Sequence, residues 1–453
     1  MGGRNEIYSK VELKQWHMII EFKFKNYKSY KDEAILSFEA LDNDYKKENY
    51  FTVELENGEK VRLLKSAAIL GANASGKSNV IWALYTLFFF VVNSRNFDNR
   101  TQLPGYLPFA FNGGVGKPVE MTIDFIANGR RYRYVIAFDL VFRFEGLYEI
   151  VREEQIPVYE ITENSDDKGR NFGHGPAWRS KTLDLSSNVS SNQLFLSFCG
   201  VNPQNGLQEV YGALADIMAI PIGETINLKA MNDSVSDNIL KSDKSDIFVQ
   251  LKRLVHIADI GVHDIHMQEH TEEEFKFPDF VPDSQRKQFV QAHKWEVKMI
   301  HKSNGKDFPL DMELESTGTK YLFGMGARVL EVLNRGGVLA CDEMNVATHP
   351  ELFKLLVSLF NSSKSNPKNA QLLFTTHDAS VIGDGSFRAD QVWFAEKNEN
   401  GESELFSAQD FEGVGIAIPF DAWYKSGRFG ALPKFGHIDY IFNNEQEDKT
   451  DER

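Results

Sequence analysis

Apolar and polar residues alternate in several short runs of the N-terminal third, and this spacing is typical of half-buried β-strands. Met18–Lys25 is the first such run, and Ala34–Ala40 is the second. Further alternating runs flank Asn57-Gly58 and Asn128-Gly129, two dipeptides that favour tight hairpin turns. We therefore predict two single strands and two β-hairpins in this part of the chain.

Helical spacing of apolar residues replaces this alternation elsewhere. Ser66–Leu70 is small and apolar throughout, as a buried strand is, and residues 79–87 after it carry apolar side chains three and four positions apart. Residues 247–257 show the same amphipathic pattern. Alternation returns around Asn304-Gly305, where we predict another hairpin.

Residues 192–240 also carry apolar positions at helical spacing, including Leu214, Ile217 and Met218. We interpret this stretch as helical. Together with residues 247–257, it leads us to expect a mainly helical insertion over residues 161–300.

Composition narrows the class of protein. A chain of 453 residues is long enough for two or three domains, and 42% hydrophobic with 25% charged residues is ordinary for a globular protein. The formal net charge of −15 argues against a surface covered in non-specific nucleic-acid contacts, although a local basic groove is compatible with it. The two cysteines, Cys199 and Cys341, lie in apolar surroundings, which predicts buried thiols in a reducing compartment. The apolar run at residues 84–92 is too short to span a bilayer and no signal peptide is visible, so we expect a cytoplasmic protein without a membrane partner.

Gly71-Ala-Asn-Ala-Ser-Gly-Lys-Ser78 matches G-x-x-x-x-G-K-[ST], the phosphate-binding loop. Between a buried strand and a helix, its backbone N–H groups and the positive end of the helix dipole form an anion site. Lys77 is expected to reach the β- and γ-phosphates of ATP, and Ser78 is expected to bind Mg²⁺. The expected ATP-binding residues of this segment are Asn73, Ala74, Ser75, Gly76, Lys77, Ser78 and Asn79.

Three further motifs follow in the C-terminal half. Ser316-Thr-Gly318 opens an amphipathic helix, and a Ser-x-Gly sequence at a helix N-terminus is a second anion-binding arrangement. Gly337–Glu343 is an apolar strand that ends in Asp342 and Glu343; we predict Asp342 as a ligand of the Mg²⁺ shell and Glu343 as the base that activates water. Gln371–His377 is a strand that ends in His377, a candidate sensor of the γ-phosphate.

Two other clusters favour structural interpretations. His263, His266 and His270 would suit a metal on a helix, but Gly261 and the neighbouring acidic residues favour an extended strand that separates them. Three arginines at the turn near Asn128 could contact phosphates, although a solvated edge strand is the favoured account. These are Arg130, Arg131 and Arg133.

The order of the motifs distinguishes between classes of phosphate-loop proteins. It runs phosphate loop, long insertion, Ser-x-Gly helix, strand with Asp342-Glu343 and strand with His377. This order resembles the ABC-type ATPase head of transporter subunits, SMC proteins and RecF-like proteins, and not that of kinases or small GTPases. The resemblance implies that the Ser316 helix reaches across a dimer to the partner's γ-phosphate, giving two composite sites. It also implies that ATP binding joins two heads and that hydrolysis releases them.

A second resemblance is carried by the stretches Met18–Tyr30, Lys65–Ser78, Leu194–Ser197, Ala258–Gly261, Glu315–Thr319, Phe374–Asp378 and Gly427–Pro433. Over residues 18–433 the chain resembles the bacterial AAA/ABC-like ATPases of the abortive-infection AbiLi and RloA type. This resemblance implies that Lys28 lies near the nucleotide and that His349 lies at the dimer seam. It further implies a role in anti-phage defence beside a separately encoded effector, as in the related Septu and PARIS systems, whose ATPases work with a nuclease-like protein. Gln102 lies in a suitable loop for the Q-loop glutamine of ABC proteins, but no other feature supports it.

We therefore predict an α/β fold, an ABC-type (SMC/RecF-like) P-loop ATPase head with a β-hairpin arm and an inserted helical subdomain. The predicted function is that of a Mg²⁺-dependent ATPase of an anti-phage system, with ATP and Mg²⁺ as cofactors. The predicted partners are further copies of the chain, a separate nuclease-like effector and possible nucleic acid. The expected divisions are a disordered extension (1–17), the N-terminal part of the head (18–160), the insertion (161–300), the C-terminal part of the head (301–435) and an acidic tail (436–453).

Three other functions stay open. A RecF-like DNA-repair clamp would show strong, salt-sensitive duplex binding. The ATP-hydrolysing subunit of a transporter is disfavoured by the long insertion and by the absence of a convincing Q-loop. A scaffold that binds ATP without hydrolysing it would release no phosphate.

Overall fold

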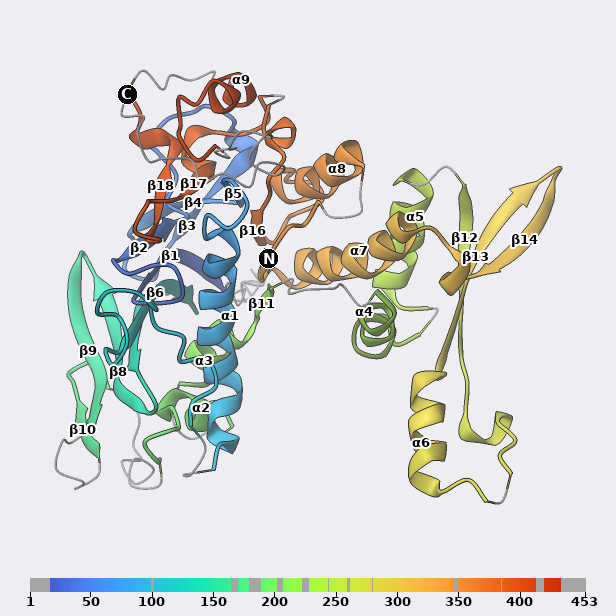
Figure 1. Ribbon diagram of the computed structural model, residues 1–453, viewed down its shortest axis with the longest axis horizontal. Coiled ribbons are helices and arrows are strands. Elements are labelled where there is room, and N and C mark those ends of the chain that lie inside the picture. Colours follow the sequence, from blue (N-terminus) through green and yellow to red (C-terminus); the bar gives the residue numbers. More distant parts are fainter. Residues whose placement is uncertain are drawn as a thin grey trace, which may run out of the picture.

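The computed structural model shows a head, which contains two large sheets, and a smaller arm. Helix α7 extends from the head into the arm (Figure 1). The predicted extension before His17 and the acidic tail after residue 435 lie outside the described residues. The described residues are 17–98, 102–163, 170–178, 189–201, 207–221, 228–242, 244–258, 261–278, 280–345, 349–383, 385–412 and 419–432.

One sheet of the head has seven strands in the order β10-β9-β8-β7-β6-β1-β2, and every neighbouring pair is antiparallel. The hairpin predicted around Asn128-Gly129 is confirmed as β6–β7, and the one around Asn57-Gly58 is confirmed as the separate pair β3–β4. The strands are β1 (Met18–Lys25), β2 (Ala34–Ser37), β3 (Tyr50–Glu54), β4 (Lys60–Leu64), β6 (Val119–Ala127), β7 (Arg130–Phe138), β8 (Phe142–Val151), β9 (Glu154–Glu163) and β10 (Arg170–His174).

The second sheet has six strands in the order β11-β15-β16-β5-β17-β18, and all but β18 run parallel. Because parallel strands are covered on both faces, their sequences are mostly apolar on both faces. In β5, Ala67 and Ile69 pack into one hydrophobic core while Ala68 and Leu70 pack into the other. The strands are β5 (Ser66–Leu70), β11 (Ile217–Ile220), β15 (Val338–Cys341), β16 (Gln371–Thr375), β17 (Val392–Lys397) and β18 (Ser403–Ser407).

Helices cover both faces of this parallel sheet. Side chains of α1 share a core with residues of both large sheets, whereas Phe353 and Leu356 of α8 pack on the opposite face. Helices α2 and α3 pack beside α1. The cysteines Cys199 and Cys341 are both buried, as predicted. The helices of the head are α1 (Lys77–Asn93), α2 (Phe195–Cys199), α3 (Gln208–Ala215), α8 (Pro350–Asn361) and α9 (Phe420–Lys425).

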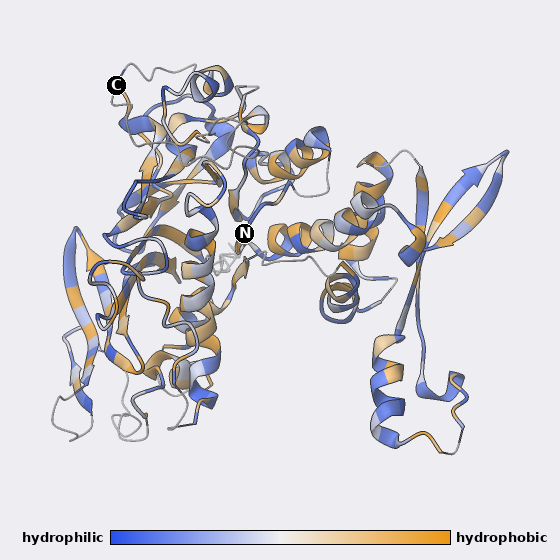
Figure 2. Cartoon of the chain, viewed as in Figure 1, coloured by the Kyte–Doolittle hydropathy of each residue, from blue (hydrophilic) through white to orange (hydrophobic). Residues whose placement is uncertain are grey.

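The arm surrounds one part of α7. Helices α4 and α5 pack against α7, and a three-stranded antiparallel sheet lies beside them. The predicted helix at residues 247–257 and the predicted hairpin at Asn304-Gly305 are confirmed as α5 and β13–β14. Helix α6 buries none of its side chains and is largely hydrophilic in Figure 2. The elements are α4 (Leu228–Val235), α5 (Asp246–Ala258), α6 (Asp283–Ala292), α7 (Thr317–Arg335), β12 (Val262–Glu269), β13 (Trp295–Ser303) and β14 (Lys306–Asp311).

The helical interpretation of Ile217 and Met218 is wrong. These residues belong to β11, which pairs in parallel with β15 inside the head. Pairing with a distant strand decides the structure of such a short apolar segment, and its local spacing does not reveal that pairing. Residues 161–300 accordingly contribute to both sheets of the head as well as to the arm.

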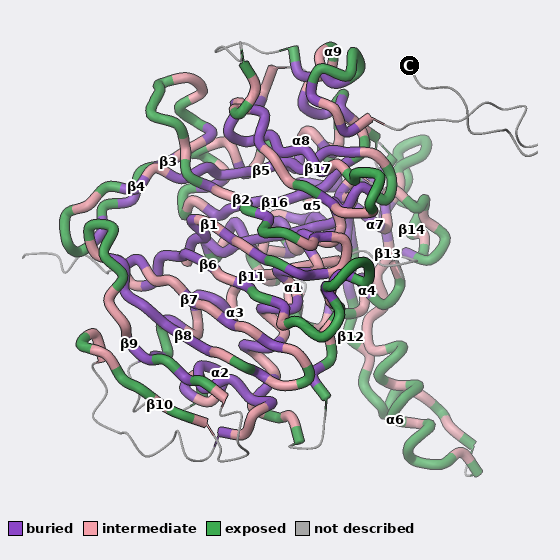
Figure 3. Tube along the Cα trace, turned by 60° about the vertical axis from the view of Figure 1, so that its left-hand side comes forward, coloured by how far each residue is buried: buried purple, intermediate pink, exposed green. Residues whose placement is uncertain are grey.

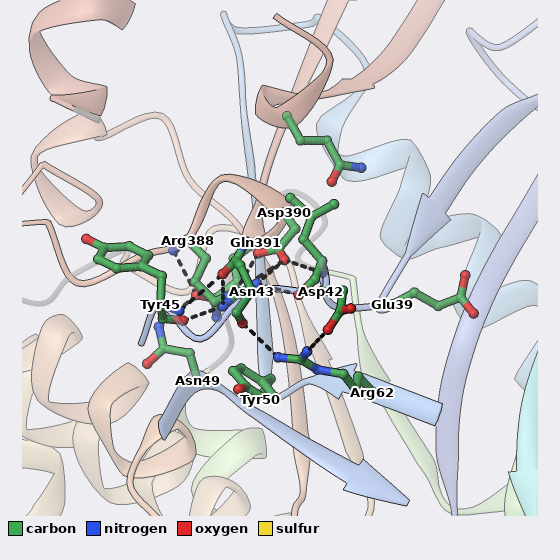
Figure 4. Close-up of polar contacts among 12 residues, drawn as sticks. Glu39, Asp42, Asn43, Tyr45, Asn49, Tyr50, Arg62, Arg388, Asp390 and Gln391 are labelled. Atoms are coloured by element: carbon green, nitrogen blue, oxygen red, sulfur yellow. Dashed lines mark hydrogen bonds and ion pairs between the residues drawn. The ribbon is translucent and has the colours of Figure 1, made fainter. Parts of the chain in front are cut away.

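A buried arginine ties the two ends of the described chain together (Figure 4). Arg388 is 2% exposed and forms an ion pair of 2.7 Å with Asp390. Its guanidinium also donates to Asn43 Oδ1 at 3.0 Å and to the carbonyl oxygens of Leu41 and Tyr45. The loop before β3 is therefore fastened to the start of β17, more than 340 positions along the chain. Figure 3 shows that the central strands of the parallel sheet are mostly buried, whereas β10 and α6 are not.

Candidate nucleotide site

The phosphate loop joins β5 to α1, and two glycines fix its path. Gly71 has φ of 152° and Gly76 has φ of 112°, values that favour glycine. A Cβ at Gly71 would lie 2.3 Å from the Ala395 carbonyl oxygen, and one at Gly76 would lie 2.6 Å from Ser403 Oγ. Strands β17 and β18 therefore approach the loop too closely for a side chain at either position.

Helix α1 begins directly at Lys77, and no side chain caps its N-terminus. The first N–H groups of a helix lack partners within it, so this end is suited to an anion. The Lys77 ammonium donates to the carbonyl oxygens of Gly71 and Ala72, both at 2.8 Å. Burial lowers the pKa of Lys77, while the charges of Glu343 and Asp342 oppose that shift. The lysine is thus held inside the loop, facing the acidic pair.

Asp342 directly follows β15 and is 1% exposed. Thr375, at the end of neighbouring β16, donates from Oγ1 to Asp342 Oδ1 at 2.6 Å. Burial raises the pKa of Asp342, and hydrogen bonds from Thr375 and Ser78 oppose that shift. Ser78, 264 positions away along the chain, therefore lies beside the Asp342 carboxylate. A serine hydroxyl and a carboxylate are hard oxygen ligands of the kind that Mg²⁺ prefers, so these two residues fit a magnesium site.

Thr375 also positions the second carboxylate, a role that we did not predict from the sequence. Its Oγ1 accepts the backbone N–H of Glu343 at 2.7 Å while donating to Asp342. Glu343 is half-buried and has φ of 42°, which is uncommon for a residue with a side chain. His377 is exposed and lies two residues after Thr375, beyond the same end of β16. Asp342 and Glu343 thus follow β15, and His377 follows Thr375 at the end of β16. All four residues lie at the carboxyl ends of two adjacent parallel strands.

Comparison with known proteins identifies the family. The profile described as "AAA domain, putative AbiEii toxin, Type IV TA system" matches residues 66–383, more than half of the chain. The chain belongs to this AAA family. No curated protein matches the chain. Together with the motif order and the sheet described above, the family match assigns the head to the P-loop ATPases of ABC/SMC type.

Three solved structures are similar to this AAA-family protein. A SMC head bound to the C-winged helix domain of ScpA is 14% identical with a TM-score of 0.43, covering 86% of this chain and 97% of that one. The SMC head domain from Thermotoga maritima is 14% identical with a TM-score of 0.38, covering 86% and 98%. An SMC head from Pyrococcus furiosus, with an extended coiled coil and bound to the C-terminal domain of ScpA, is 14% identical with a TM-score of 0.38, covering 86% and 96%. Because these scores lie below 0.5, the assignment rests on the family match and on the motifs.

Lys28 of this AAA-family protein lies close to the same site. Its backbone has φ of 51°, and its Nζ lies 4.3 Å from the centre of the Trp82 ring on α1. Burial lowers the pKa of Lys28, and the charge of Asp342 opposes that shift. Lys28 is therefore within electrostatic reach of Asp342, although it comes from the loop after β1.

The Ser-x-Gly segment caps α7 at a different place. Ser316 Oγ accepts the backbone N–H of Thr319 at 3.1 Å, which is an N-cap contact. Ser316 is exposed and Gly318 is partly exposed. The Tyr321 hydroxyl, one turn into α7, donates to the Met344 carbonyl oxygen at 2.8 Å. This bond links the start of the helix to the chain just after the acidic pair.

The remaining predicted residues have other partners. His349 Nδ1 accepts the Glu351 N–H at 3.3 Å and caps α8, while Gln102 is exposed in its loop.

Within the described residues no group of three His, Cys, Asp or Glu side chains could hold a metal, and His263 and His266 lie on strand β12 as expected. No helix in the described part of the chain is long and apolar enough to cross a membrane. The expectation of an edge strand for the arginine cluster is wrong, because β7 lies between β6 and β8. The arginines pair with acids, through Arg133–Asp124 (2.7 Å), Arg131–Asp124 (3.3 Å) and Arg130–Glu149 (3.2 Å).

Proposed function

We propose that this protein is a Mg²⁺-dependent ATPase that acts in anti-phage defence through a separate effector. The observation that carries the proposal is the convergence of Ser78 and the hydrogen-bonded pair Thr375–Asp342 beside Lys77. This group lies where the carboxyl ends of parallel strands meet a helix N-terminus, the usual phosphate site of α/β proteins.

Binding begins with the loop between Asn73 and Asn79. Its backbone N–H groups surround the β- and γ-phosphates, and Lys77 exchanges its two carbonyl contacts for phosphate oxygens. Lys28 adds a second positive charge from the loop after β1. Ser78 and Asp342 would hold Mg²⁺, which would supply positive charge beside the triphosphate.

Hydrolysis depends on Glu343 and His377. Glu343 orients the attacking water and accepts its proton, because its backbone is fixed by Thr375 beside the Asp342 carboxylate. His377 contacts the γ-phosphate from the end of the neighbouring strand. Ser316 and Gly318 of a second copy close the site, since the cap of α7 is accessible. Two such sites form per two-fold dimer, with His349 near the seam.

The family description supports the defence role, since it names a toxin–antitoxin system. We infer that the nucleotide state of the paired heads controls a separately encoded, nuclease-like effector. Nucleic acid remains a possible ligand of that complex, and duplex binding that weakens steeply with salt would instead support a RecF-like clamp.

Phosphate release by the purified chain tests the proposal. Lys77→Ala should abolish ATP binding, because the loop loses its only side-chain charge. Glu343→Gln should bind ATP, hydrolyse it at least about 100-fold more slowly, and accumulate as an ATP-dependent dimer on size-exclusion chromatography. Glu404→Gln, an exposed substitution on β18, is the matched control and should behave as the wild type. Undiminished turnover by Glu343→Gln would remove Glu343 from its assigned role.

A further inference from the structure

A chain of four hydrogen-bonded polar groups contacts the phosphate loop. The hydroxyls of Ser29 and Ser403 are 2.7 Å apart, and Asn79 Nδ2 donates to Ser29 Oγ at 2.7 Å. Ser403 Oγ donates to the Ser75 carbonyl oxygen, also at 2.7 Å. The four groups come from the loop after β1, from the phosphate loop, from α1 and from β18.

The number of available protons determines which group donates in each of these hydrogen bonds. The Ser75 carbonyl oxygen can only accept, so it takes the single hydroxyl proton of Ser403. The proton between the two serines must then come from Ser29, and Ser29 accepts from the Asn79 amide. The order Asn79, Ser29, Ser403, Ser75 is therefore the only one that satisfies all three bonds. Loss of either hydroxyl breaks it.

The chain lies directly against the glycine that precedes α1. A Cβ at Gly76 would lie 2.6 Å from Ser403 Oγ and 3.0 Å from Ser29 Oγ. Ser403 is 5% exposed, and its backbone N–H donates to the Ser29 carbonyl oxygen at 2.7 Å. The segment that carries Lys28 is therefore linked to the phosphate loop through β18. The hydroxyls of both Ser29 and Ser403 lie beside Gly76.

We propose that Ser403 and Ser29 are positioning residues that hold Lys28 and the phosphate loop in one frame, so that both contact the same triphosphate. This inference rests on the proposed function and adds two residues to it. The two serines touch no phosphate themselves. They act by fixing the peptide between Ser75 and Gly76, whose N–H belongs to Gly76 of the phosphate loop, and the backbone adjoining Lys28.

The affinity for a fluorescent ATP analogue, measured with Mg²⁺ present, tests the inference in the full-length chain. Ser403→Ala and Ser29→Ala should each weaken binding about fivefold, the size of one hydrogen bond. The double variant should be no weaker than either single variant, because either loss breaks the chain. Ser407→Ala is the matched control: this serine is also buried on β18 but caps the following turn, and its affinity should equal that of the wild type.

Combining Ser29→Ala with Lys28→Ala distinguishes a role in positioning Lys28 from a general contribution to the stability of the fold. If the serines act by placing Lys28, Ser29→Ala should weaken binding clearly less in the Lys28→Ala background than in the wild type. Equal effects in both backgrounds would overturn the inference, as would unchanged affinity in Ser403→Ala and Ser29→Ala while the wild type binds ATP. The latter result would leave the proposed function standing, whereas a wild type that fails to bind ATP would overturn both.

Discussion

Thr375 controls the geometry of the acidic pair with a single hydroxyl. Its proton goes to Asp342 at 2.6 Å, and its oxygen accepts the Glu343 N–H at 2.7 Å. Both contacts are needed because Asp342 is buried, and burial of a carboxylate without a donor is costly. The residue thereby sets the position of the candidate magnesium ligand and of the candidate base together.

Thr375→Val keeps the shape of this side chain and removes the hydroxyl. We expect a loss of stability of about 1–3 kcal/mol, because Asp342 Oδ1 and the Glu343 N–H lose their partner. ATP turnover should fall and more Mg²⁺ should be needed to support it. Thermal unfolding and a Mg²⁺ titration of phosphate release measure the two effects. Thr122→Val, at a half-buried position of β6, is the control, and equal behaviour of the two variants would contradict the assignment.

Lys77, Ser78, Asp342 and Glu343 could be selected from the sequence because short motifs fix their types and their place after a strand. Thr375 and Ser403 could not. Their roles depend on which strands are neighbours and on how closely β18 approaches Gly76, and both are properties of the folded sheet.

Among the elements, strands with strong alternation and helices with long apolar stripes were predictable, as β6–β7, α5 and α7 show. β11 was not, because four apolar residues carry too little periodicity to distinguish a strand from a helix. Its pairing with β15 is a contact across more than 100 positions that no local pattern encodes.

The segment Gly427–Leu432, which sequence resemblance singled out, packs against the parallel sheet. Phe429 is 1% exposed, stacks on Phe394 of β17 at 4.7 Å and meets Phe411 edge-on at 5.2 Å. Gly430 approaches Glu396 so closely that a Cβ would lie 2.8 Å from Oε2. This segment therefore braces β17, the strand that contacts Gly71 of the phosphate loop.

Phe429→Ala should destabilise the protein by about 3–5 kcal/mol, because it removes a buried ring and leaves a cavity. Urea unfolding measures this change. Phe280→Ala is the control, since Phe280 is 85% exposed and its loss should change stability by less than about 0.5 kcal/mol. Similar midpoints for the two variants would show that the segment does not brace the sheet.

At the scale of the whole molecule, segments from both ends of the described chain form one head. Arg388 is the clearest structural link, since it joins the loop at Asn43 to Asp390 across the full span of the insertion and arm. Breaking a buried ion pair leaves a charge without its partner, which usually costs more than the pair contributes.

Arg388→Met should therefore destabilise the head by about 3–5 kcal/mol. Arg143→Met is the matched control: Arg143 pairs with Asp139 on the surface, where such a pair contributes at most about 1 kcal/mol. Limited proteolysis should release the loop before β3 earlier in Arg388→Met than in the control. Identical cleavage would mean that Arg388 does not hold the two halves together.

The central claim is that segments far apart in the chain converge on one Mg²⁺-bound triphosphate. The most direct test is the affinity for ATP with and without Mg²⁺, measured for the wild type and for Asp342→Asn. We predict that Mg²⁺ strengthens ATP binding by the wild type and that Asp342→Asn loses most of this gain, because the Asp342 carboxylate lies beside Ser78. The same gain from Mg²⁺ in both proteins would contradict the account.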